Sequence, residues 1–128
     1  MSKQSTATED AQLFRLPANS IAYVAVIAAL VSAVIHLLLA PRVMQFSQTT
    51  GILFYLNGAG WIGGLFLFFS RFWRRELYLV AAGYALVTLV AFFAMGGRLN
   101  TMAIASKAVE AVVVLATVYL YTAEPSGP

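Results

Sequence analysis

Lys107 and Glu110 are two oppositely charged residues inside an otherwise apolar stretch, Met102–Tyr121. Because they are three positions apart, a helix places both side chains on one face, about one turn from each other. The stretch is long enough to cross a bilayer, which takes about 20 residues. Charged side chains inside such a helix are costly, and they usually face protein or water. The pair is therefore a candidate functional site.

His36 and Asn57 are further polar residues inside apolar stretches. If the stretches cross the membrane in alternating directions, a rise of about 1.5 Å per residue places both in the same half of the membrane as Lys107 and Glu110. We predict one polar cluster of these four residues. Imidazole titrates near neutral pH, so His36 with Glu110 can pass a proton or bind a small cation. In the other interpretation, the cluster only holds the helices together by hydrogen bonds.

The composition indicates that lipid is the main solvent of the chain. Hydrophobic residues make up 61% of the 128 residues and charged residues only 10%. Soluble domains carry about 25% charged residues. The net charge of +3 is small, and in a membrane protein such charge sets orientation before it suggests nucleic acid. We expect the bilayer, and no nucleic acid, as a partner.

Hydropathy and helix-breaking residues predict an all-α integral membrane four-helix bundle with up-down topology. Pro41 is expected to end the first helix, and a loop to follow to about Thr50. Asn19 or Ser20 can start the first helix, and Asn100 or Thr101 the fourth. The expected single domain, 20–121, has helices at about 20–40, 51–69, 77–95 and 102–121, between flexible polar tails at 1–19 and 122–128.

The basic residues predict the orientation of these four spans in the cell membrane. The side that holds both termini carries Lys3, Arg15, Arg71, Arg74 and Arg75, and the other side carries Arg42 and Arg98. Since cytoplasmic loops are richer in Lys and Arg, both termini are expected in the cytoplasm.

Small residues in the second stretch offer a surface for close helix packing. Gly60 and Gly64 form a GxxxG pair, which lets two membrane helices approach closely. The pair can pack within one bundle, or it can join two copies of the chain or a different membrane subunit.

The residue inventory offers little for catalysis or cofactor binding. The chain has no cysteine and one histidine, which excludes thiolate chemistry and Cys-ligated zinc or iron–sulfur clusters. Methionines near His36 suit copper by ligand type, but their spacing forms no recognised motif. We expect no catalytic residue, no metal and no cofactor; a membrane enzyme is a third alternative, disfavoured because no nucleophile or metal set is visible.

Four short segments together resemble a known group of proteins. They are Ile35–Pro41, Gly51–Gly58, Arg74–Val80 and Lys107–Glu110. The chain resembles small four-helix membrane proteins of unknown function that are found mainly in halophilic archaea. The resemblance covers about Ser20–Tyr121 and implies the fold.

Two hypotheses of function remain at this point. In the first, the chain is a non-enzymatic structural or accessory subunit of a membrane complex. In the second, it is a small transporter or a proton- or ion-conducting protein that uses His36, Asn57, Lys107 and Glu110.

Overall fold

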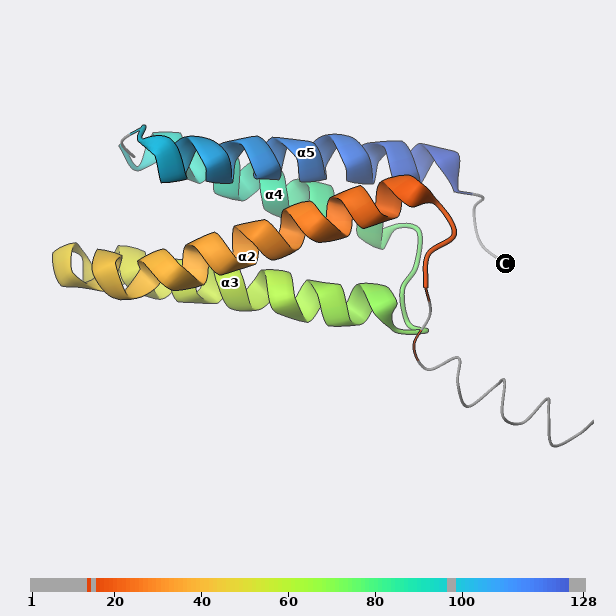
Figure 1. Ribbon diagram of the computed structural model, residues 1–128, viewed down its shortest axis with the longest axis horizontal. Coiled ribbons are helices and arrows are strands. Elements are labelled where there is room, and N and C mark those ends of the chain that lie inside the picture. Colours follow the sequence, from red (N-terminus) through yellow and green to blue (C-terminus); the bar gives the residue numbers. More distant parts are fainter. Residues whose placement is uncertain (1–13, 15, 97–98, 125–128) are drawn as a thin grey trace, which may run out of the picture.

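A computed structural model describes residues 14, 16–96 and 99–124. This part of the chain folds into four α-helices and contains no strand beyond an isolated bridge between Phe14 and Ser70 (Figure 1). The helices are α2 (Ser20–Phe46), α3 (Gln48–Phe69), α4 (Leu77–Ala94) and α5 (Thr101–Ala123). The predicted all-α fold with four helices is confirmed. Most residues of the two predicted flexible tails lie outside the described residues.

Two asparagines fix the starts of α2 and α5. The side chain of Asn19 accepts a hydrogen bond from the amide of Ile21 at 2.9 Å. The side chain of Asn100 accepts one from the amide of Ala103, also at 2.9 Å. Each satisfies an amide that the first helical turn leaves without an intrahelical carbonyl. Both caps agree with the starts expected from the sequence.

The first helix does not end at Pro41, which is a correction to the sequence prediction. α2 continues for a further turn to Phe46, and only Ser47 separates it from α3. Ser47 makes this short turn possible because its hydroxyl accepts from the amide of Thr50 at 3.2 Å. The extra turn also packs on α3: a Cβ atom at Gly51 would collide with the side chain of Met44. This packing offsets the hydrogen bond that proline removes.

Two helical hairpins, α2–α3 and α4–α5, join through α2 and α5. α2 packs on both α3 and α5, while α4 packs mainly on α5. In their most apolar segments, 39% of the residues of α2 and of α5 are buried, against 17% for α3 and for α4. α2 and α5 are therefore the central pair. At the end opposite the termini, the α2–α3 hairpin projects beyond α4–α5 (Figure 1).

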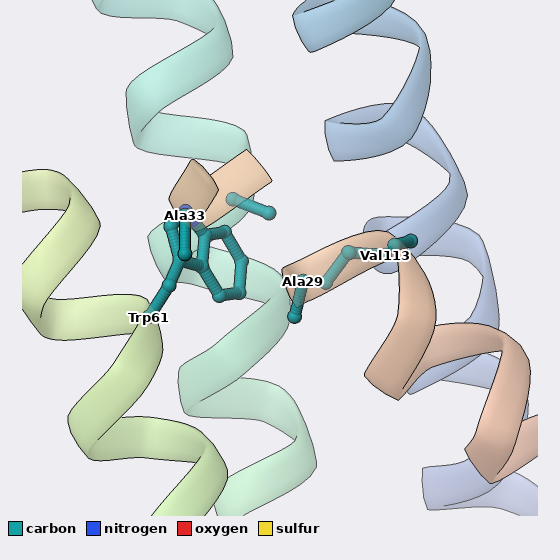
Figure 2. Close-up of a cluster of buried hydrophobic side chains, with 6 residues drawn as sticks. Ala29, Ala33, Trp61 and Val113 are labelled. Carbon is teal, nitrogen blue, oxygen red and sulfur yellow. The ribbon is translucent and has the colours of Figure 1, made fainter. Parts of the chain in front are cut away.

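Small side chains allow the central helices to approach closely. Ala29 of α2 lies beside Val113 of α5, and Trp61 of α3 reaches Ala33 of α2 (Figure 2). Trp61 also meets the ring of Tyr84 edge-on, with centroids 4.8 Å apart. A second apolar cluster lies nearer the termini and contains Ala22, Phe68, Tyr78 and Leu120. The interior of the bundle from the first cluster to the terminal end is therefore largely apolar.

The outer surface of the bundle is largely apolar. Large aliphatic side chains such as Ile27, Val87 and Leu115 are more than 60% exposed. All four helices are long and apolar enough to cross a membrane. Burying such a surface in lipid removes it from water, which is the favourable outcome for apolar area.

Candidate functional site

Glu110 is the buried centre of the ionic cluster. Its side chain is 0% exposed, and Lys107 lies 2.7 Å away, from Nζ to Oε1. α5 brings the two together because residues three apart share one helix face. An uncompensated carboxylate in this position would carry a large desolvation cost, which the ammonium group of Lys107 offsets. The pairing predicted from the spacing of these two residues is present.

His36 reaches the same carboxylate from α2. Its Nε2 atom lies 3.6 Å from Oε2 of Glu110, and its side chain is 6% exposed. Its other ring nitrogen, Nδ1, lies 2.8 Å from the backbone carbonyl oxygen of Ser32. A carbonyl oxygen can only accept a hydrogen bond, so Nδ1 carries a proton and donates it. The contact orients the ring so that Nε2 faces Glu110.

This orientation determines which protonation states are favourable. A neutral ring with its proton on Nδ1 presents a lone pair at Nε2. A lone pair facing an ionised carboxylate is repulsive, so the contact between His36 and Glu110 is favourable when Nε2 or the carboxyl group carries a proton. The cluster can therefore hold one proton between His36 of α2 and Glu110 of α5, in addition to the charge on Lys107.

Aromatic rings surround the two basic side chains. The ammonium group of Lys107 lies 4.8 Å from the ring centroid of Phe92 on α4. The imidazole of His36 lies 5.2 Å from the ring centroid of Phe54 on α3. A cation above an aromatic face is attracted by the ring's quadrupole. Each hairpin thus supplies one ionisable side chain with an aromatic neighbour.

Asn57 does not contact the ionic cluster in the described structure. The hydroxyl of Tyr84 donates to its backbone oxygen at 2.8 Å and lies 3.3 Å from its side-chain oxygen. This contact joins α3 to α4. The structure therefore brings His36, Lys107 and Glu110 together and places Asn57 with Tyr84. Tyr84 was not among the sequence candidates, because its hydroxyl gains significance only when α4 lies beside α3.

A pocket opens beside the cluster at the end opposite the termini. Its volume is about 480 Å³, and both His36 and Lys107 line it. Arg42 and Phe46, from the projecting part of α2, form one side, and the first turn of α5 forms another. The sequence could not reveal this pocket while Pro41 was taken as the end of the helix. The cluster is therefore reached from one end of the bundle.

The described residues include no group of three His, Cys, Asp or Glu side chains that could hold a metal ion. His36 and Glu110 are the only such residues in the cluster. With Lys107 they can bind a proton and hold two helices together.

A second cavity, of about 190 Å³, lies between α3 and α4 and has an almost entirely apolar lining. Gly60 and Gly64 both line it. The space beside Gly60 is occupied, since a Cβ atom there would collide with the hydroxyl of Tyr84. No atom lies within 4 Å of the corresponding point at Gly64.

Comparison with known proteins identifies a family. Residues 7–121 match a family of unknown function, DUF7475. No curated protein and no solved structure matches the chain. The chain belongs to the DUF7475 family, which agrees with the resemblance to a family without assigned function. The expectation that this family occurs mainly in halophilic archaea stays a prediction.

Proposed function

We propose that this member of the DUF7475 family is a non-enzymatic, multi-pass protein of the cell membrane that acts as a structural or accessory subunit of a membrane complex. In this proposal, His36, Lys107 and Glu110 fasten its two hairpins to each other. The family assignment supplies no activity, so the proposal depends on the geometry of the cluster.

The contact between His36 and Glu110 carries the proposal. It crosses from α2 to α5, the helices through which the two hairpins pack. Apolar packing alone specifies helix pairing weakly in lipid, because lipid tails are as apolar as leucine. A polar contact between buried groups favours one pairing and one register, since any other arrangement loses the contact between His36 and Glu110 while Lys107 stays paired within α5. A fixed arrangement of four helices is what a subunit of a larger complex requires.

The small transporter is the second candidate, and the pocket favours it. Water can reach His36 and Lys107 from one end of the bundle. On the other side of Glu110, Val113, Trp61 and four alanines form an apolar core. Conduction would therefore require a second arrangement of the helices that opens this apolar core.

Glu110→Gln distinguishes the two candidates, with Glu76→Gln as the matched control because Glu76 is an exposed carboxylate outside the cluster. Under the fastening role, Glu110→Gln lowers the melting temperature in detergent, and wild-type proteoliposomes conduct no more protons than protein-free liposomes. Proton flux in the wild type that Glu110→Gln abolishes, with the fold intact, would replace the fastening role by the transport role.

The open side of α3 is the surface that we propose for a partner. The space beside Gly64 is empty, and a glycine lets another membrane helix approach closely. The sequence suggested a partner, either a second copy of the chain or another membrane subunit, that packs through Gly60 and Gly64; since the hydroxyl of Tyr84 occupies the space beside Gly60, we propose contact at Gly64. Gly64→Leu would fill the cavity between α3 and α4 and is expected to abolish cross-linking between subunits in membranes. Unchanged cross-linking would place the interface elsewhere.

We also propose that both termini lie in the cytoplasm. The turn between α3 and α4, at the same end of the bundle as the termini, contains Arg71, Arg74 and Arg75. The excess of basic residues at this end supports the orientation. The pocket beside the cluster then opens at the outer face.

A further inference from the structure

We propose that the pocket beside His36 and Lys107 binds the phosphate group of an anionic membrane lipid. This inference rests on the proposed membrane location, but it goes beyond the fastening role and does not depend on that role. It rests on the hydroxyl of Ser106 in the pocket lining, two cationic side chains, the first turn of α5 and the position of the pocket.

Ser106 is the first reason to expect a ligand. Its side chain is 4% exposed, and it lines the pocket. No hydrogen bond of its hydroxyl to another described residue is found, and the hydroxyl is not among the fully buried polar atoms, so it is open to the pocket. Polar groups of such largely buried residues are normally paired with protein, water or a ligand. Ser106 is thus a donor that a molecule in the pocket can satisfy.

The charge of the lining indicates that this molecule is an anion. Arg42 and Lys107 both line the pocket, and no carboxylate does. Glu110 lies behind Lys107 and compensates one positive charge. Arg42 has no ion-pair partner in the part of the chain that the structure describes. The lining therefore carries a net positive charge when His36 is neutral, and a larger one when it is protonated.

The first turn of α5 adds backbone donors to the cations. Thr101 and Met102 line the pocket, and their amides belong to the turn in which no intrahelical carbonyl is available. The Asn100 side chain occupies only the amide of Ala103. This turn contains no acidic residue that would occupy the site. Helix N-termini favour phosphate because amides and the helix dipole both face the anion.

The walls and the position of the pocket favour a lipid over a free anion. Apolar side chains surround the polar groups, and they include Phe46, Phe54, Phe92 and Met102. The pocket lies at an end of the bundle, where lipid headgroups meet the helix termini. Basic pockets between membrane helices bind phosphate-containing headgroups in this way, with acyl chains along the apolar surface. A free phosphate would use only the polar part of the lining.

Native mass spectrometry of the full chain in detergent tests the proposal. The probes are phosphatidylglycerol, the zwitterionic phosphatidylcholine, and inorganic phosphate in large excess. We expect phosphatidylglycerol to bind more tightly than phosphatidylcholine, and inorganic phosphate to leave it bound. Arg42→Gln should weaken phosphatidylglycerol binding about fivefold, the typical effect of one basic residue near a charged membrane surface. Ser106→Ala should also weaken it.

Arg74→Gln is the matched control, because Arg74 is an exposed arginine at the opposite end of the bundle. It should leave lipid binding unchanged. Arg42 is exposed, so its substitution leaves the core intact. The proposal is overturned if both lipids bind equally, or if neither Arg42→Gln nor Ser106→Ala weakens binding. Displacement of the lipid by inorganic phosphate would identify a free anion as the ligand and overturn the lipid assignment.

Discussion

The Nε2 atom of His36 lies 3.6 Å from Oε2 of Glu110, and this contact joins the two hairpins of the bundle through α2 and α5. This contact contributes to stability because it lies in a buried part of the bundle. Glu110 is fully buried and depends on His36 and Lys107 for charge compensation. The core between Glu110 and the terminal end of the bundle is apolar.

Glu110→Gln should destabilise the protein strongly. The substitution leaves the charge of Lys107 in a largely buried position, where its side chain is 13% exposed. Removal of one partner of a buried ion pair costs about 3–5 kcal/mol, and we expect a loss near the lower limit because Lys107 can turn toward the pocket. Thermal unfolding in detergent measures the effect. Glu76→Gln should change stability by less than about 0.5 kcal/mol, and equal effects of the two variants would contradict the account.

The single histidine allows a direct spectroscopic prediction. Because Nδ1 of His36 donates to the carbonyl of Ser32, the ring must carry a proton on Nδ1 in every protonation state of the cluster. Nitrogen-15 NMR of the sole histidine should therefore show a protonated Nδ1 at neutral pH. A spectrum with an unprotonated Nδ1 and a proton only on Nε2 would rule out the described ring orientation.

Gly60→Ala should destabilise the bundle, whereas Gly63→Ala should not. A Cβ atom at Gly60 would collide with the hydroxyl of Tyr84, which donates to Asn57. Loss of that hydrogen bond costs about 1 kcal/mol, and Tyr84→Phe should have a similar effect. No atom lies within 4 Å of the corresponding point at Gly63, so alanine there should be neutral or stabilise the helix by up to about 1 kcal/mol. The reverse order would show that Tyr84 does not pack against Gly60.

Cysteine labelling tests the arrangement in the membrane. The chain has no native cysteine, so single probes report one position each. Gln45 and Arg74 are both exposed and lie at opposite ends of the bundle. We expect an impermeant maleimide to label Gln45→Cys from outside intact cells and Arg74→Cys only after the membrane is permeabilised. Labelling of both positions from outside would contradict four spans with cytoplasmic termini.

Much of the fold follows from local sequence signals. Apolar length predicts the number of helices, and Asn19 and Asn100 predict two helix starts because short polar side chains cap the first turn. The prediction that the first helix ends at Pro41 was wrong. The effect of this proline on the backbone is local, but the continuation of α2 depends on Met44 packing against Gly51 of α3. That contact joins α2 to α3, so the sequence pattern of α2 alone could not predict it.

The site was predictable to the extent that it lies on one helix. Lys107 and Glu110 are three residues apart, so their pairing follows from helix geometry. Hydropathy gives the depth of His36 and Asn57 but not the neighbours of each helix. α2 packs on α5, so His36 reaches the cluster, whereas Asn57 on α3 meets Tyr84. Ser106 and Arg42 gain significance only from the pocket that they line.

A double-mutant cycle between His36 and Glu110 tests the fastening role most directly. Thermal unfolding in detergent would compare the wild type, His36→Gln, Glu110→Gln and the double variant. Because the two side chains share one contact between the hairpins, the account predicts that the double variant loses less stability than the sum of the single variants, with a coupling of at least about 0.5 kcal/mol. Additive losses, with a coupling within about 0.3 kcal/mol of zero, would show that His36 and Glu110 do not join α2 to α5.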